Sequence, residues 1–195
     1  MTKFCMFVLA ACLAYVNAQI PKPCAAPKEW EARIAEYDPA KKFDRHGKVS
    51  YDYANLRVRL IEDETVEGKE QFEDVLYLHD AGVEYRLDIK TRKCERRPIS
   101  RPFPALHVPS NATWYGEYYI GTSSNHGAGV LVDVWGGHFE DGSRANGEWT
   151  QRDCLPISFT SYKPNEGYFI WKHYDYTLGI SDPMVFIPPK ECLSL

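Results

Sequence analysis

The sequence lacks a long hydrophobic run, an excess of basic residues and an internal repeat. Its main apolar stretch, Phe4–Val16, falls short of the roughly 20 residues that a membrane-spanning helix needs. Lys and Arg total 23 against 27 Asp and Glu, and these charges are scattered along the chain. The short apolar run argues against a transmembrane segment. The scattered, slightly acidic charge forms no basic patch that would bind nucleic acid or anionic membranes.

Catalytic signatures are also missing. The chain has no nucleophile elbow, no paired-histidine zinc helix and no phosphate loop, and its six histidines are scattered. Gly127-Ala128-Gly129 is an incomplete glycine pattern, and it lies where a hairpin turn is expected rather than before a helix. We therefore expect no catalytic residues and predict that the protein is not an enzyme.

Metal-binding patterns are weak. No Cys-x-x-Cys pair is present, which argues against zinc. Glu62-Asp63-Glu64 is the densest acidic cluster, but it lacks the glycine and the alternating ligands of an EF-hand loop. We interpret this cluster as a solvated turn between strands, so no metal ligand is assigned and no cofactor is required.

What the chain does have begins with a signal peptide. Lys3 precedes the apolar run, and Val16-Asn17-Ala18 places small residues at the positions that a signal peptidase reads. Cleavage is predicted between Ala18 and Gln19, which leaves residues 19–195 as one domain. Because Lys3 is the only charge removed, the net charge changes from −4 to −5.

Cysteine content and a glycosylation motif fit the same secretory route. Removal of residues 1–18 leaves four cysteines, Cys24, Cys94, Cys154 and Cys192. An even number in a secreted chain implies two disulfides, and spacing alone does not choose among the three pairings. Asn111-Ala112-Thr113 is the only N-glycosylation acceptor in the sequence. It follows a proline-containing loop, so we expect a surface glycan on Asn111.

Alternation of apolar and polar residues dominates the remaining chain and predicts short strands joined by tight turns. The predicted strands are 56–60, 75–78, 83–90, 114–120, 130–135, 146–151, 157–162 and 168–176. Only Lys28–Tyr37 has good helix composition, and a short helical turn is expected near Asp182-Pro183. The stretch Pro98–Pro109 is predicted to connect two groups of hairpins inside one domain.

Several predicted strands are apolar on both faces. Between residues 130 and 135, for example, Leu131 and Trp135 oppose Val132 and Val134. In a sheet with one face exposed to solvent, apolar and polar residues would alternate more strictly. Such strands either belong to a sheet covered on both sides or line an apolar pocket, and the pattern alone does not separate the two.

The order and spacing of several short motifs resemble those of the ependymin-related proteins over nearly the whole of residues 19–195. The motifs that carry the resemblance include Pro23-Cys24-Ala25-Ala26-Pro27, Asn55-Leu56-Arg57-Val58-Arg59, Ile120-Gly121-Thr122-Ser123-Ser124, Asp153-Cys154-Leu155-Pro156-Ile157-Ser158 and Val185-Phe186-Ile187-Pro188-Pro189. The resemblance implies a mainly β fold in which two stacked antiparallel sheets form a half-open barrel around a deep hydrophobic pocket, similar to bacterial lipoprotein carriers.

The resemblance implies further properties. These are the disulfides Cys24–Cys154 and Cys94–Cys192, calcium association, a homodimer, and a secreted or lysosomal location. Some relatives carry a third bridge, for which this chain has no cysteines, so the conformation of the C-terminal tail and its dimer contacts are left open.

The resemblance also favours the pocket interpretation of the two-sided strands. We predict a secreted glycoprotein that binds hydrophobic or lipid-like molecules; the alternative is an extracellular matrix or adhesion glycoprotein with calcium-dependent interactions. The candidate pocket residues are Leu76, Leu78, Leu87, Trp114, Tyr118, Ile120, Val132, Val134, Trp135, Phe159, Tyr168 and Trp171.

Overall fold

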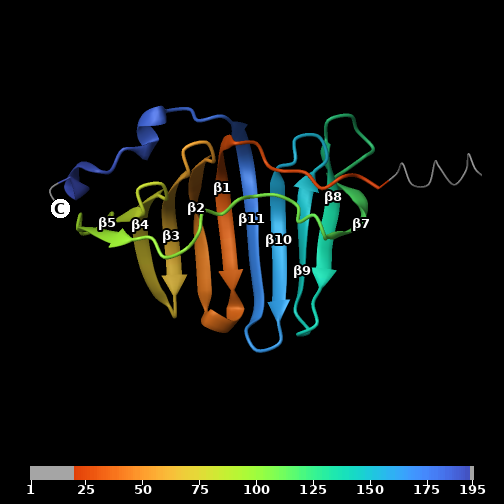
Figure 1. The fold of residues 1–195 in the computed structure, drawn as a ribbon, viewed down its shortest axis with the longest axis horizontal. Coiled ribbons are helices and arrows are strands. Elements are labelled where there is room, and N and C mark those ends of the chain that lie inside the picture. The colour runs from red at the N-terminus through yellow and green to blue at the C-terminus, as the bar shows by residue number, and fades with distance from the viewer. Residues whose placement is uncertain (1–19, 194–195) are drawn as a thin grey trace, which may run out of the picture.

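The computed structural model describes residues 20–193 and consists almost entirely of antiparallel strands (Figure 1). The strands are β1 (Glu29–Asp38), β2 (Phe43–Asp52), β3 (Arg57–Val66), β4 (Lys69–Leu78), β5 (Val83–Asp88), β6 (Cys94–Pro98), β7 (Thr113–Gly121), β8 (Gly129–His138), β9 (Arg144–Thr150), β10 (Pro156–Lys163) and β11 (Gly167–Leu178). Short 3-10 turns occur at η1 (Pro39–Lys41), η2 (Pro183–Phe186) and η3 (Lys190–Cys192). The predicted signal peptide and its cleavage site lie outside the described residues.

All eleven strands hydrogen-bond in one continuous sheet. The order is β6-β5-β4-β3-β2-β1-β11-β10-β9-β8-β7. The predicted mainly β fold is confirmed, but the two groups of hairpins do not form separate stacked sheets. The first strand and the last strand join them, because β1 pairs with β11 from Trp30 opposite Leu178 to Tyr37 opposite Ile170.

The helix considered at residues 28–37 is wrong, because this segment forms β1. Trp30, Ala32 and Ile34 are buried while the residues between them are more exposed, which is the period of a strand. Pairing with β2 on one side and β11 on the other outweighs local helix propensity. The helical turn expected near Asp182 is present, since the Asp182 carboxylate accepts a hydrogen bond from the Met184 amide at the start of η2.

The inner face of the sheet is crossed by residues 99–112, a segment that we call the crossover. Figure 1 shows it running from β6 across the strands to β7. Ile99, Phe103 and Leu106 of the crossover pack against the buried core, and the Tyr51 hydroxyl donates a hydrogen bond to the Pro104 carbonyl at 3.0 Å. The predicted long connection therefore covers the sheet and supplies part of its core.

The N-terminal segment holds the crossover in place. The Ala26 amide donates to the Leu106 carbonyl at 3.0 Å, and the Val108 amide donates to the Cys24 carbonyl at 2.8 Å. Cys24 is bridged to Cys154, in the loop between β9 and β10. This is one of the two pairings that the family resemblance implied, and it fastens the crossover to the β7–β11 half of the sheet.

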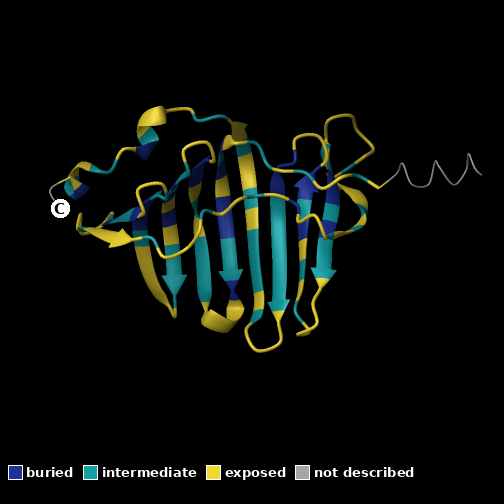
Figure 2. Cartoon of the chain, viewed as in Figure 1, coloured by how far each residue is buried: buried dark blue, intermediate teal, exposed yellow. Residues whose placement is uncertain are grey.

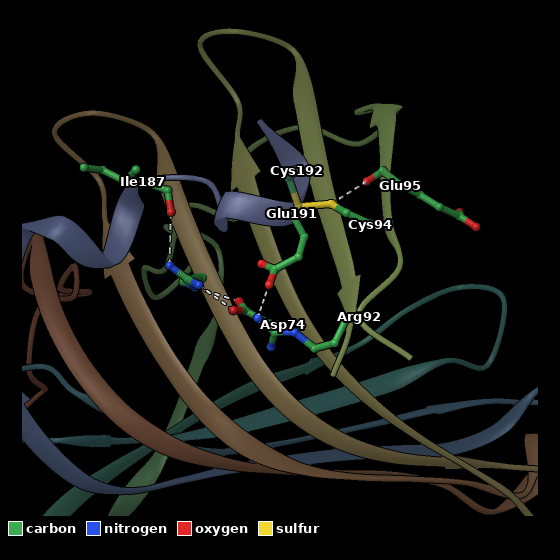
Figure 3. The surroundings of a disulfide bond; sticks show 8 residues. Asp74, Arg92, Cys94, Glu95, Ile187, Glu191 and Cys192 are labelled. Carbon is green, nitrogen blue, oxygen red and sulfur yellow. Dashed lines mark hydrogen bonds and ion pairs between the residues drawn. A yellow bond between two sulfur atoms is a disulfide. The ribbon is translucent and has the colours of Figure 1, made fainter. Parts of the chain in front are cut away.

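The opposite surface, the outer face, is covered at one end by the C-terminal segment. Arg59 pairs with Asp74 and donates to the Val185 carbonyl at 2.5 Å, while Cys192 is bridged to Cys94 of β6 (Figure 3). The edge strands β6 and β7 are mostly exposed, whereas β1 carries buried residues along its length and β4 is buried from Glu73 to Tyr77 (Figure 2).

Candidate ligand-binding pocket

A cavity of about 510 Å³ lies between the crossover and the inner face of β8–β11. Its lining is mostly apolar, aromatic or glycine. The lining residues are Ala105, Leu106, His107, Pro109, Asn111, Ala112, Thr113, Trp135, Gly136, Gly137, His138, Phe139, Ala145, Asn146, Gly147, Trp149, Phe159 and Trp171.

The floor of the cavity combines large rings with missing side chains. Phe159 and Trp171 stack with ring centroids 5.8 Å apart. Gly147 lies opposite Phe159 in one strand pair and opposite Trp135 in the other. A Cβ on Gly147 would lie 3.0 Å from the Trp149 Nε1 atom, so only glycine fits without displacing that ring. Small residues next to large aromatic rings thus leave space where the inner face would otherwise be filled.

The buried end of the cavity rests on a second hydrophobic cluster. Val108 of the crossover packs there with Trp135, Trp149 and Cys154. Trp114 packs against the same cluster, and its indole nitrogen donates to the Asp133 carboxylate at 3.0 Å. Because this bond satisfies the buried carboxylate, Asp133 acts as part of the scaffold.

Neutral groups separate the cavity from the rest of the inner face. The His173 ring lies 4.6 Å from the Trp171 ring and 5.2 Å from the Trp30 ring. Burial lowers the pKa of His173 to about 4, even though a hydrogen bond with the Pro156 carbonyl acts in the opposite direction. Tyr176 also donates to this carbonyl at 2.6 Å. At neutral pH the His173 ring beside Trp171 therefore carries no charge.

A charged cluster begins one strand away from the cavity. Glu36 lies directly opposite Trp171 in the β1–β11 pairing and opposite Arg45 in the β1–β2 pairing. The Arg45 guanidinium lies 3.4 Å from the Glu36 carboxylate, 3.3 Å from Glu62 and 3.1 Å from Glu64. At the level of Trp171, the inner face thus changes from aromatic on β11 to ionic on β1 and β2.

Burial is the main influence on the pKa of Glu62. Its side chain is 1% exposed. Burial raises the pKa of this carboxyl to about 7; Arg45 opposes the rise and Glu64 adds to it. The interpretation of residues 62–64 as a solvated turn is wrong. They lie within β3, where the alternation of the strand places a buried Glu62 and a half-buried Glu64 on the inner face, and Asp63 points outward.

The described residues offer no evident metal centre. Across residues 20–193, no group of three or more His, Cys, Asp or Glu side chains is arranged to hold a metal ion. Within the same part of the chain, no helix has the length and apolar character needed to cross a membrane.

Strand alternation separates the twelve predicted pocket residues. Trp135, Phe159 and Trp171 line the cavity, and Trp114 lies in the cluster beside it. The other eight do not line it. By alternation with inner-face neighbours they point to the outer face: Leu76, Leu78, Leu87, Tyr118, Ile120, Val132, Val134 and Tyr168.

Sequence reasoning missed the residues that the crossover contributes and the small residues of the floor. Gly147 within the predicted strand 146–151 was an available signal, because glycine inside a strand marks a place where another group approaches closely. Gly136 and Gly137 follow directly after the predicted strand 130–135 and lie inside β8 in the structure. The part played by Ala105 and Leu106 had no local signal, since it depends on where the crossover lies.

The fold and the cavity together define a class, namely antiparallel β proteins with an apolar pocket beneath a long connection. The Ependymin family model matches residues 67–192, and the chain belongs to this family. It is 31% identical over 176 residues to "Mammalian ependymin-related protein 1" of Rattus norvegicus, covering 88% of this chain and 77% of the relative.

Other comparisons agree. The chain is 28% identical over 147 residues to "Ependymin-2" of Carassius auratus, covering 75% of this chain and 68% of the relative. Among solved structures, an uncharacterized conserved protein from Thermus thermophilus aligns with a TM-score of 0.53 at 10% identity, covering 94% of this chain and 95% of that one. At this identity the likeness concerns the fold alone.

Proposed function

We propose that this chain is a secreted, non-enzymatic glycoprotein that holds hydrophobic or lipid-like molecules in the inner-face pocket. The observation that carries the proposal is the cavity of about 510 Å³ between the crossover and β8–β11. Its volume lies within the roughly 300–1,000 Å³ range of small-molecule sites. The signal peptide predicted at residues 1–18 and the two disulfides support secretion.

The lining favours an apolar chain over a polar ligand. Trp135, Phe159 and Trp171 offer ring surface, and His173 beside them is neutral at physiological pH. Each methylene buried by a ligand contributes about 0.8 kcal/mol, reduced by the cost of ordering the chain. Affinity should therefore depend on chain length far more than on ionic strength.

Charged side chains lie one strand beyond the lining of the pocket. Glu36 lies opposite Trp171, so a ligand whose chain contacts Trp171 would bring its head group toward Glu36 and Arg45. We therefore extend the proposal to amphipathic molecules, with the chain under the crossover and the head group toward β1. The family resemblance adds calcium association and a homodimer, and sedimentation with and without calcium tests both.

The test is a titration of the secreted protein with fluorescent alkyl probes of increasing length, together with mass spectrometry of lipids extracted from protein taken from its natural source. We expect two added methylenes to tighten binding about tenfold until the pocket is full. Ala145→Phe should fill the cavity and weaken binding at least tenfold, because Ala145 lines it.

Thr160→Phe is the matched control, since Thr160 neighbours Phe159 on β10 and points to the outer face. It should leave the affinity within twofold of the wild type. Absence of extracted lipid together with absence of probe binding would reject the proposal. Calcium-dependent binding to collagen or cells that persists in Ala145→Phe would instead support the matrix or adhesion alternative.

A further inference from the structure

The sole glycosylation acceptor lies on the rim of the pocket. Asn111 of the motif Asn111-Ala112-Thr113 is one of the residues that line the cavity, and Thr113 is another. Asn111 is itself exposed. We propose that an N-linked glycan on Asn111 overhangs the mouth of the pocket and slows both entry and exit of apolar ligands. This inference rests on the proposed function.

Exposure distinguishes the mouth of the cavity from its buried end. Trp135, Gly147 and Trp149 are buried, whereas Asn111, His138 and Phe139 are exposed. Asn111 comes from the crossover, and His138 and Phe139 come from the end of β8. The acceptor thus lies on the exposed side of the cavity, together with the exposed crossover residues His107 and Pro109.

The attachment point is held firmly relative to the pocket. The Ala112 amide donates to the Pro109 carbonyl at 3.0 Å, which fixes the turn that carries Asn111. The preceding crossover residue Val108 is hydrogen-bonded to Cys24, and Cys24 is bridged to Cys154. A bulky, hydrophilic glycan rooted here cannot move away with a loose loop.

This geometry predicts a kinetic effect with little change in affinity. A glycan at the mouth does not contact the floor formed by Phe159 and Trp171, so it leaves the interactions of a fully bound chain unchanged. It crowds the path that the chain takes in both directions. The association and dissociation rate constants should therefore fall together, whereas their ratio, the Kd, should stay nearly constant.

The experiment uses full-length protein secreted from eukaryotic cells, with intact mass reporting whether Asn111 is occupied. Stopped-flow fluorescence with an alkyl probe gives both rate constants before and after an endoglycosidase trims the glycan to its first sugar. Asn111→Gln removes the acceptor, and protein treated with heat-inactivated endoglycosidase is the control. We expect trimming to raise both rate constants at least threefold with Kd changed less than twofold, Asn111→Gln to raise both rate constants as well, and the control to match untreated protein.

The remaining outcomes distinguish failure of the gating proposal from failure of the pocket function. Unmodified Asn111 in the secreted protein, or equal rate constants in glycosylated and trimmed samples, overturns the gating proposal and leaves the pocket function standing. Failure of every form to bind the probe overturns both. Trimming acts on protein that is already folded, so a folding defect in Asn111→Gln does not affect the outcome.

Discussion

At the level of Trp171, two neighbouring regions of the inner face are filled differently, and we call them the pocket half and the charged half. On one side of Trp171, Phe159 of β10 lies directly opposite it, and Gly147 of β9 lies opposite Phe159. A cavity lies over these positions. On the other side of Trp171, the residues at the same level are Glu36 of β1, Arg45 of β2 and Glu64 of β3. Arg45 forms ion pairs with both glutamates. The two regions share strand geometry, and they differ in side-chain chemistry and in the crossover residues that roof the pocket. The hydrophobic core that includes Trp30, Tyr51 and Val75 lies farther along the strands of the charged half.

The two halves also differ in their source of free energy, which is ion pairing in one and burial of apolar surface by a ligand in the other. The charged half loses hydration energy on folding and regains part of it through the ion pairs around Arg45. The pocket half leaves ring surface uncovered at Phe159 and Trp171, which a ligand can bury. Stability should therefore respond most to changes in the charged half, and binding should respond most to changes in the pocket half.

The largest effect is expected from Arg45→Met. This change leaves Glu36, Glu62 and Glu64 without their shared cation and should lower the free energy of unfolding by about 3–5 kcal/mol, as for other broken buried pairs. Arg33→Met is the matched control, because Arg33 pairs with Asp175 on the surface and should cost only about 0–1 kcal/mol. Urea unfolding measures both. Equal losses would show that the charged half is not a buried ionic core.

The next effect is a pair of opposing pH dependences. The pKa of Glu62 is about 7 in the folded chain against 4.5 ordinarily, so its contribution to stability grows as pH falls from 7 and is complete below 4.5. The pKa of His173 is about 4 against 6.5, so its contribution is present above pH 6.5 and lost as pH falls toward 4. Each is worth roughly 3 kcal/mol, and in the wild type they oppose each other between pH 6.5 and 4.5.

Single variants separate the pH dependence due to Glu62 from that due to His173. Glu62→Gln should lose stability as pH falls from 6.5 to 4.5, because the opposing contribution of Glu62 to the His173 dependence is removed. His173→Phe should gain stability over the same range, and the Pro156 carbonyl keeps its bond from Tyr176. Urea unfolding at pH 7.5, 6.5, 5.5 and 4.5 measures both profiles. Variants whose profiles match the wild type would contradict the assignment.

The smallest effect concerns two aromatic residues on β11. Trp171→Ala removes one wall of the cavity and should weaken alkyl-probe binding about tenfold, or ~1.4 kcal/mol. Tyr168→Ala lies three residues away, on the outer face, and should change the Kd less than twofold. Fluorescence titration measures both. A similar loss in the two variants would place the ligand elsewhere on the sheet.

Much of the fold could be predicted from the sequence, because alternation identifies strands wherever polar and apolar residues take turns, as in Val83–Asp88. The strand β1 was obscured by its helix-favouring composition. The strand β2 was not predicted, and its first half is polar, with Asp44, His46 and Lys48. Pairing with neighbouring strands forms both elements, and that information is not local.

The pocket could be predicted only in part. The rings of Trp135, Phe159 and Trp171 line it, but periodicity does not say which face of a two-sided strand is the inner one. Outer-face residues such as Tyr118 and Tyr168 were therefore included with them. The crossover decides the question, because it covers one face and supplies Leu106 and Ala112 as the roof.

The most direct test of the central claim is photolabelling with an alkyl chain that carries a diazirine, followed by digestion and mass spectrometry. The apolar pocket beneath the crossover predicts labels on residues 105–113 and on inner-face positions such as Phe159 and Trp171, reduced by an excess of unlabelled chain. Labels concentrated on the outer face, at Tyr118, Ile120 or Tyr168, would contradict it.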